Sequence, residues 1–146
     1  MRAVVSRVSS ARVEVHGDVV GELTGPGLLV LLGVRADDDP GTAPEMARRL
    51  HELRVLRGDR SCADTGAGLL VVSQSPLHAA PRRGRRPSHL AAARPEWAEP
   101  LVDAVVAALR ARGAAVATGR FGAEMAVTSI GDGPFTVLVD VPARAG

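Results

Sequence analysis

The longest apolar run in this chain limits its possible folds more than any other feature. It covers residues 27–34 and reads Gly-Leu-Leu-Val-Leu-Leu-Gly-Val. A run of this length is far too short to cross a bilayer, which takes about 20 apolar residues. It follows a turn at Gly25-Pro26 and is typical of a strand buried on both faces of a sheet. The run therefore predicts a sheet that other parts of the chain cover.

Length and composition indicate one compact domain. We expect residues 1–146 to form it, because a chain of this size can bury a substantial core. Hydrophobic residues make up 46% of the chain, which excludes a disordered protein. The single cysteine, Cys62, excludes an internal disulfide bond and a multi-cysteine metal cluster. Arginines interrupt the first seven residues, which therefore lack the apolar core of a signal peptide. We expect a soluble, cytoplasmic protein that does not bind membranes.

Hydrophobic periodicity predicts an α/β fold with many strands and two main helices. Strands are expected at residues 1–8, 11–15, 19–23, 28–34, 69–73, 115–118, 125–130 and 135–141. Thr42 and Glu45 form a candidate capping box for a first helix. A second helix is expected to end at Gly113, and residues 57–68 are expected to form a loop. This set favours a mixed sheet covered by helices on one side.

The motifs of several common enzyme classes are absent from the sequence. It contains no Gly-x-Ser-x-Gly nucleophile motif, no phosphate-binding P-loop, no Gly-x-Gly-x-x-Gly and no His-Glu-x-x-His. The four histidines lack the spacing of metal ligands. We therefore expect neither a metal nor an organic cofactor.

The strand expected at residues 69–73 ends in two polar residues, Ser73 and Gln74. Ligand sites of α/β proteins commonly lie at such strand ends. Alternatively, both side chains only satisfy backbone groups where the chain turns, before Pro76 ends the strand. Taken alone, the segment favours the simpler interpretation.

All cationic side chains are arginines, and four of them fall within five residues. Arg82, Arg83, Arg85 and Arg86 lie in a segment bounded by prolines. Forked guanidinium groups suit phosphates, whereas a solvated run of charge is the usual alternative. The glycine and proline of this segment limit its shape, which favours phosphate contact. The net charge of the chain is only +2, so the position of this cluster matters more than the total.

A third segment separates the last two expected strands and contains Gly133-Pro134. Asp-Gly and Gly-Pro steps are ordinary in turns. A functional role would need a cis peptide bond before Pro134, an isomer that only proline makes readily accessible. The sequence leaves both isomers open.

Taken in order, the motifs of this chain resemble those of the D-aminoacyl-tRNA deacylase family over nearly its full length. The matching motifs are Met1-Arg2-Ala3-Val4-Val5-x-Arg7-Val8, Gly25-x-Gly27-Leu28, Leu69-Leu70-Val71-Val72-Ser73-Gln74, Gly84-Arg85-Arg86-Pro87-Ser88, Ala98-Glu99-Pro100-Leu101, Thr118-Gly119-Arg120-Phe121-Gly122-Ala123-Glu124-Met125 and Asp132-Gly133-Pro134-Phe135-Thr136. Each motif is weak by itself, but the ordered set is specific.

The resemblance implies a three-layer β/β/α sandwich with a mixed, barrel-like sheet, which forms a homodimer. It also implies hydrolysis of the ester between a D-amino acid, or mischarged glycine, and the 3′-terminal adenosine of tRNA. Gly133 and Pro134 would reach into the partner subunit's pocket, oriented by Arg7. There they would form a rigid wall that leaves no room for an L-side chain, which is specificity by repulsion.

The same resemblance assigns the remaining site residues. Ser73 and Gln74 would line the ester that is cleaved. The pocket around the substrate would include Arg7, Ser75, Pro76, Phe121, Met125 and Thr136. The phosphates of the acceptor stem would be held by Arg83, Arg85 and Arg86.

Around this expected pocket the chain departs from the family pattern. The family motif Ser-Gln-Phe-Thr-Leu reads Ser-Gln-Ser-Pro-Leu here, so Pro76 lacks both the hydroxyl and the backbone N–H of the usual threonine. An N–H that stabilises an oxyanion is worth roughly 10²–10³ in rate. Gly131, His78 and His89 also replace the usual Asn, Tyr and aromatic residues. Two alternatives therefore stay open: a homologue diverted to another aminoacyl or acyl substrate in a biosynthetic pathway, and a non-catalytic RNA-binding dimer.

Overall fold

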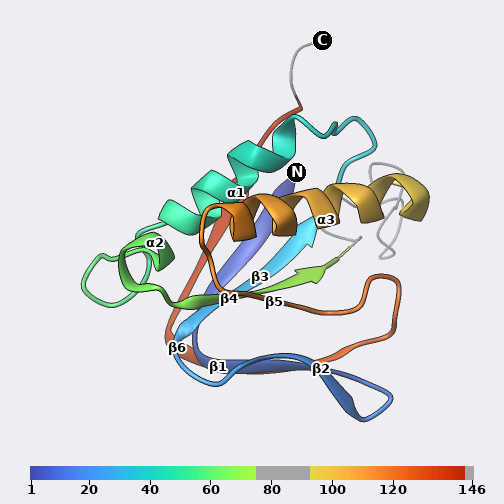
Figure 1. Ribbon diagram of the computed structural model, residues 1–146. Helices are drawn as coiled ribbons and strands as arrows, with labels where there is room; N and C mark the ends of the chain where they lie inside the picture. Colours follow the sequence, from blue (N-terminus) through green and yellow to red (C-terminus); the bar gives the residue numbers. More distant parts are fainter. Residues whose placement is uncertain (75–92, 144–146) are drawn as a thin grey trace, which may run out of the picture.

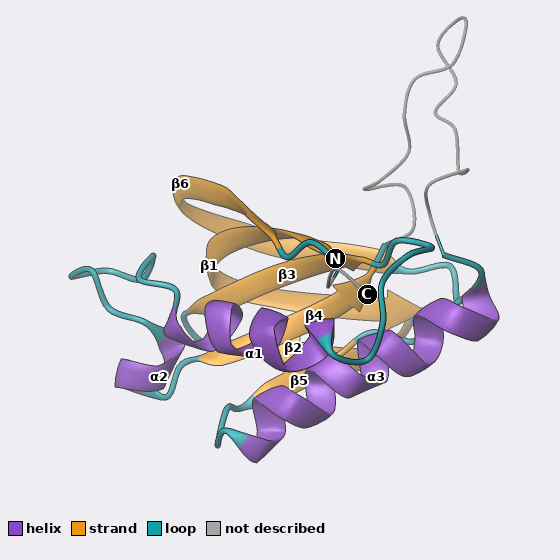
Figure 2. Ribbon diagram, turned by 90° about the horizontal axis from the view of Figure 1, so that it is seen from above, coloured by secondary structure: helices purple, strands orange, loops and turns teal. Residues whose placement is uncertain are grey.

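The structure, a computed structural model, describes residues 1–74 and 93–143 (Figure 1). Within these residues one mixed sheet has the strand order β2-β1-β3-β4-β5, and β6 also pairs with β1. The strands are β1 (Arg2–Val15), β2 (Asp18–Leu23), β3 (Gly27–Gly33), β4 (Gly68–Ser73), β5 (Val116–Thr118) and β6 (Ala126–Asp140). The helices are α1 (Thr42–Glu52), α2 (Cys62–Thr65) and α3 (Pro95–Ala111). Figures 1 and 2 show α1 and α3 side by side over one face of the sheet.

β1 is the central strand because it pairs with three others. Its first half pairs with β3, its second half with β2, and nearly its whole length with β6, all antiparallel. The pairs β3–β4 and β4–β5 are parallel. At the far edges, Gly21 of β2 lies so close to the carbonyl of Thr118 in β5 that a Cβ would overlap it. The two edge strands thus approach each other, and the sheet is almost closed into a barrel.

The sheet separates two hydrophobic clusters, which explains the unbroken apolar run of β3. Leu28 and Val30 belong to the cluster under α1 and α3. Leu29, between them, belongs to the cluster inside the barrel, together with Val13 and Leu70. Successive side chains of a strand point to opposite faces, so both faces of β3 are buried, as its sequence predicts. The expected fold class is confirmed.

Two long strands replace the four shorter ones that periodicity predicts. Residues 1–8 and 11–15 join in β1, and residues 125–130 and 135–141 join in β6. These two strands pair with each other, and Ser10 lies opposite Ile130 in that ladder. A partner distant in sequence therefore keeps β1 extended through Ser9 and Ser10. In place of the expected turn at residues 131–134, β6 continues, with an interruption of its pairing at residues 132–135.

The two main helices, α1 and α3, lie where the sequence predicts them, but the expected cap of α1 is wrong. α1 begins at Thr42 itself, and no side chain caps its N-terminus. Glu45 accepts hydrogen bonds from two arginines one turn further on instead. A capping box does occur at α2, where Ser61 and Asp64 exchange hydrogen bonds. This short helix lies in the segment that was expected to be a loop.

The N-terminus is buried and ties four parts of the chain together. The Met1 ammonium lies 2.8 Å from a carboxylate oxygen of Asp38 and donates to the carbonyl oxygen of Val141 at 2.7 Å. The indole N–H of Trp97, in α3, donates to the carbonyl oxygen of Asp38 at 2.9 Å. These bonds join the start of β1, the loop before α1, the chain after β6 and α3.

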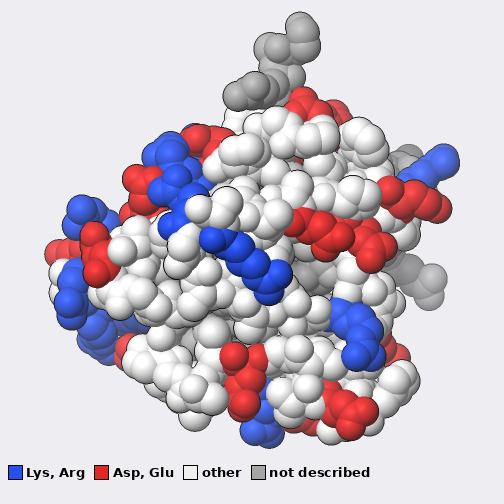
Figure 3. Space-filling view, in the orientation of Figure 1, with Lys and Arg blue, Asp and Glu red and all other residues white. Residues whose placement is uncertain are grey.

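The charged surface is mixed in sign. On the face shown in Figure 3, arginines and acidic side chains are interspersed. Within the described part of the chain, ion pairs join side chains of opposite charge, such as Arg112 with Glu52 at 2.7 Å. Among the helices that the structure describes, none is long and apolar enough to cross a membrane.

Candidate active site

Ser73 and Gln74 lie where β4 ends, between the parallel strands β3 and β5. The backbone N–H of Gln74 donates to the carbonyl oxygen of Leu32 at 2.8 Å, so the ladder continues one residue beyond β4. Both side chains are half-buried, and Ser73 lines a cavity. A polar side chain at a cavity and at the carboxyl end of a parallel strand is in the usual position for binding a ligand.

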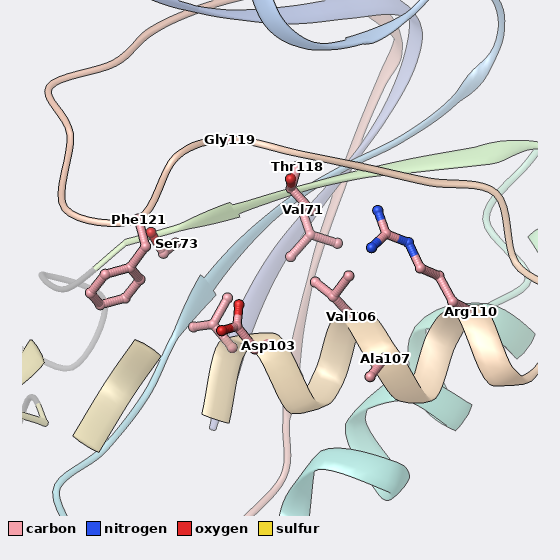
Figure 4. Close-up of a pocket in the computed structure, with 10 residues that line it drawn as sticks. Val71, Ser73, Asp103, Val106, Ala107, Arg110, Thr118, Gly119 and Phe121 are labelled. Atoms are coloured by element: carbon pink, nitrogen blue, oxygen red, sulfur yellow. The ribbon is translucent and has the colours of Figure 1, made fainter. Parts of the chain in front are cut away.

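This cavity has a volume of about 520 Å³ and lies between α3 and the strands β4 and β5 (Figure 4). Its apolar wall includes Val71, Val102 and Val106. Its polar side chains come from both layers: Ser73 and Thr118 from the sheet, Asp103 and Arg110 from the helix. A hollow with an apolar wall and a few polar groups suits a small organic group that carries hydrogen-bonding atoms.

Sequence reasoning missed Asp103 and Arg110. They are seven residues apart in α3, which is two helical turns, so they lie on the same face of the helix. The guanidinium of Arg110 donates to the carbonyl oxygen of Val116 at 3.1 Å, which holds its side chain against the start of β5. The seven-residue spacing was visible in the sequence. Only the packing of α3 on the sheet shows that this face borders a cavity.

Phe121 and Met125 lie on opposite sides of the chain that follows β5. Phe121 lines the cavity with Ser73, and Figure 4 shows the two side chains close to each other. Met125 packs against the cluster inside the barrel, with its sulfur 2.7 Å from where a Cβ of Gly119 would be. The structure thus brings Phe121 to Ser73, whereas Met125 supports a cavity-lining glycine from behind.

A second group of expected site residues surrounds an interruption in β6. The ladder pairs Ser6 with Thr136 and Val8 with Gly131. Residues 132–135 are therefore an excursion opposite a single residue of β1, Arg7, which makes it a large bulge. The hydroxyl of Thr136 lies 3.2 Å from that of Ser6 at the base of the excursion.

Gly133 and Pro134 lie in this excursion and are both exposed. The peptide bond between them is cis, the isomer that a functional role requires. Gly133 has a φ of +126°, which L-residues rarely adopt. A Cβ there would also come within 2.8 Å of Nη2 of Arg7. The backbone conformation therefore requires glycine, and a side chain there would also displace the guanidinium of Arg7.

The side chain of Arg7 connects the excursion to the rest of the molecule. It is only 11% exposed. Its Nε donates to the carbonyl oxygen of Asp132 at 3.0 Å, and Nη1 donates to that of Val55 at 3.1 Å. Its guanidinium carbon lies 5.1 Å from the ring centre of Phe135. Arg7 thus contacts the residues on both sides of Gly133-Pro134, as an orienting residue would, although the role itself stays a prediction.

The two groups lie apart within one chain. Of the described residues, those that line the hollows beside Ser73 include neither Arg7 nor Gly133-Pro134. The other expected site residues lie outside the part of the chain that the structure describes: Ser75, Pro76, Arg83, Arg85 and Arg86.

Two solved structures match this fold along nearly their whole length. One, described as c-Myc DNA Unwinding Element Binding Protein, superposes with a TM-score of 0.90 at 33% identity and covers 98% of this chain and 100% of its own. The other, a probable eukaryotic D-amino acid tRNA deacylase, superposes with a TM-score of 0.84 at 17% identity, covering 96% and 98%. At that identity the second match shows the fold alone. The barrel-like sheet under two helices is thus a fold that this chain shares with both solved structures.

Sequence comparison identifies the family to which this chain belongs. The family profile described as D-Tyr-tRNA(Tyr) deacylase matches residues 4–140. The D-aminoacyl-tRNA deacylase of Kineococcus radiotolerans is 58% identical over 140 residues, which cover 96% of this chain and 99% of that protein. The corresponding protein of Streptomyces coelicolor is 56% identical over 141 residues, covering 97% and 100%. This chain belongs to the D-Tyr-tRNA(Tyr) deacylase family, which confirms the resemblance of its motifs.

Proposed function

We propose that this chain hydrolyses the ester between a D-amino acid, or glycine, and the 3′-terminal adenosine of tRNA, in the cytoplasm. One observation carries the proposal. A chain that matches the family over residues 4–140 places the motif residues Ser73 and Gln74 where a parallel strand ends at a cavity. The curated relatives are deacylases by name. This activity is therefore favoured over the diverted homologue and the non-catalytic dimer.

The terminal adenosine would lie in the cavity between α3 and β4. Its volume of about 520 Å³ is within the range of about 300–1,000 Å³ that small-molecule sites usually have. The ring of Phe121 and the side chain of Val102 offer apolar contact to a flat base. The guanidinium of Arg110 offers donors to the adjoining phosphate.

Hydrolysis in this position needs a held carbonyl and stabilisation of the oxyanion that develops on it. Water adds to the ester carbonyl carbon, the bond from that carbon to the 3′-oxygen breaks, and the 3′-oxygen takes up a proton. The products are the free D-amino acid and tRNA. The hydroxyl of Ser73 and the side-chain amide of Gln74 can donate hydrogen bonds to the developing oxyanion. By resemblance to the family, main-chain groups and the 2′-hydroxyl of the tRNA would also assist the hydrolysis.

The wall that selects D-amino acids would come from a second copy of the chain. Gly133 and Pro134 are exposed and lie away from the cavity of their own chain. The strand that carries them also exposes four large apolar side chains: Val127 (39%), Ile130 (61%), Phe135 (42%) and Leu138 (67%). Exposed apolar side chains gathered on one element mark interaction surfaces. A two-fold symmetric dimer would present each excursion to the partner's cavity.

Replacing Ile130 with aspartate tests the dimer. Wild-type protein should scatter light as a particle of twice the 15.1 kDa chain mass. Ile130→Asp should scatter as a monomer and lose deacylation, because a charge would lie in the proposed interface. Val19→Asp is the matched control, because Val19 is also exposed (53%) but lies on β2. A wild-type monomer at micromolar concentration would contradict the proposal.

Arg83, Arg85 and Arg86 would bind the phosphates of the acceptor stem. The support is the arginine cluster in the sequence. Replacing Arg85 and Arg86 together with alanine should weaken tRNA binding and flatten its dependence on salt, by nearly one unit of slope for each phosphate that is no longer neutralised. An unchanged affinity and slope would make the cluster a solvated surface.

Deacylation of D- and L-tyrosyl-tRNA by the purified protein tests the activity itself. We expect release of the D-amino acid, and of glycine from glycyl-tRNA, with the L-ester left intact. Equal cleavage of both enantiomers would contradict the role of Gly133-Pro134 as the wall that excludes L-amino acids. Cleavage of neither would favour a diverted or non-catalytic homologue.

A further inference from the structure

Arg57 extends from a short turn that is anchored in the core. The chain between α1 and α2 folds back through a bridge between Leu56 and Arg60. Val55 and Leu56, directly before Arg57, are 7% and 8% exposed and belong to the cluster under the helices. The Arg57 side chain itself is 70% exposed. Its backbone is therefore well fixed, although its guanidinium reaches into solvent.

The guanidinium of Arg57 binds the carboxylate of Asp132 at two points. Nη2 donates to Oδ1 at 2.6 Å, and Nε donates to Oδ2 at 3.3 Å. Such two-point pairing fixes both direction and distance. Nε of Arg7 also lies 3.6 Å from Oδ2 of the same carboxylate. The hydrogen bond from Arg57, with the nearby charges of Arg57 and Arg7, lowers the pKa of Asp132, so the carboxylate stays charged at neutral pH.

Asp132 directly precedes Gly133 in the excursion from β6. Residues 132–135 lie outside the β1–β6 ladder, so ladder hydrogen bonds do not fix their position. Arg7 holds the excursion from β1, and Arg57 holds it from the turn before α2. A single attachment would leave the excursion free to pivot, whereas two attachments on separate elements restrict that rotation.

We propose that Arg57 is a positioning residue for the selection of D-amino acids, because its grip on Asp132 sets where Gly133 and Pro134 stand against the substrate. This role rests on the proposed function, in which those two residues form the chiral wall. A steric wall discriminates only if its atoms stay in place, since a displacement of about 1 Å at a reacting centre already changes rates severely. Loss of Arg57 would therefore admit L-amino acids without removing any group that touches the substrate.

Arg57→Ala and Arg54→Ala form a matched pair for testing this role. Arg54 is equally exposed (70%), and its nearest described carboxylate, that of Asp64, is 3.9 Å away. Both variants lose one positive charge of the same segment. Arg57→Ala should lower the ratio of kcat/KM for D- over L-tyrosyl-tRNA about threefold to fivefold, as expected for an exposed but well-aligned ion pair. The KM for tRNA should not change. Arg54→Ala should keep the wild-type ratio, and Arg57→Lys should restore part of it.

Two further measurements separate positioning from a general structural effect. The double variant Arg57→Ala/Asp132→Asn should show the same ratio as Arg57→Ala, because the pair acts as one unit. In ¹H–¹⁵N spectra of the free protein, the Gly133 amide and Arg7 Nε signals should shift in Arg57→Ala and not in Arg54→Ala. These spectra need no substrate and no turnover.

The outcomes distinguish this role from the proposed function. An unchanged ratio together with unchanged Gly133 signals would overturn the role of Arg57 and leave the deacylase activity intact. An equal rise in KM in both variants would show that the two arginines attract tRNA by their charge, and this result would also overturn the positioning role of Arg57. If wild-type protein cleaves neither enantiomer, the proposed function fails, and the spectra still decide whether Arg57 positions the excursion.

Discussion

Replacing Arg7 with lysine keeps the positive charge beside the β6 excursion but removes the planar guanidinium that donates to two carbonyl oxygens. The guanidinium of Arg7 reaches two carbonyl oxygens at once, those of Asp132 and Val55, and lies 5.1 Å from the ring centre of Phe135. A lysine ammonium is a single point of charge on a flexible stem, and it cannot reproduce this planar, two-sided contact. Arg7→Lys should therefore weaken both the fold and the hold on Gly133-Pro134.

The contacts of Arg7 set the size of the effect. A hydrogen bond from a charged donor contributes about 1.5–3 kcal/mol, and a lysine at this position would keep only one of the two. The interaction of the guanidinium with the Phe135 ring adds about 0.5–1 kcal/mol. Because the Arg7 side chain is only 11% exposed, water offsets little of this loss. We expect Arg7→Lys to lower the free energy of unfolding by about 2–4 kcal/mol.

Urea unfolding followed by circular dichroism measures this change, at one protein concentration for all variants because dimerisation would stabilise the folded state. Arg12→Lys is the matched control on the same strand. Arg12 is 48% exposed and pairs with Glu14 at 2.7 Å, so its replacement should cost less than about 1 kcal/mol. If Arg7→Lys were as stable as Arg12→Lys, Arg7 would not anchor the excursion, and the account of how Gly133-Pro134 is held would be wrong.

Three further predictions concern a buried ion pair, a surface ion pair and a buried thiol. Asp38→Ala should destabilise the protein by about 3–5 kcal/mol in the same assay, because it leaves the buried Met1 ammonium without a carboxylate to balance its charge; a loss below about 1 kcal/mol would contradict this. The pKa of Asp132 is lowered from 3.8 by its pairing with Arg57, so the stabilisation from this pair is fully present above that value and disappears as the pH falls through the lower folded pKa. The stability difference between wild type and Asp132→Asn should thus stay constant between about pH 5 and about pH 8 and close in stronger acid. Burial raises the pKa of the Cys62 thiol to about 12, so iodoacetamide at neutral pH should modify Cys62 only in unfolded protein, as mass spectrometry would show.

The elements that sequence analysis predicted well are those whose signal is local. β3 is recognisable because each of its faces meets an apolar layer, so no polar residue interrupts it. The last helix is recognisable from its apolar stripe and from Gly113, which follows it. The strands β1 and β6 were each divided in two, because the pairing that keeps them continuous links residues more than a hundred positions apart. No pattern in a single strand reveals such a partner.

The residues of the candidate site also fall into two groups, those that the sequence indicated and those that only the structure revealed. Ser73, Gln74, Gly133 and Pro134 were found from motifs, which record residue types in order and need no structure. Asp103 and Arg110 were missed, because a polar residue on a helix has no functional meaning until a cavity lies beside it.

The sequence by itself determined the family, the apolar strands and helices, and the residues that the reaction is expected to use. These follow from residue type and spacing along the chain. The tertiary structure alone decided that residues 132–135 leave the sheet as one excursion, and that Arg57 and Asp132 meet across 75 positions. It also placed Ser73 and Gly133-Pro134 on separate parts of one chain, which is what makes a second copy part of the proposed mechanism. Such relations depend on which distant backbones pair and on which side chains then face each other, and local chemistry does not specify either.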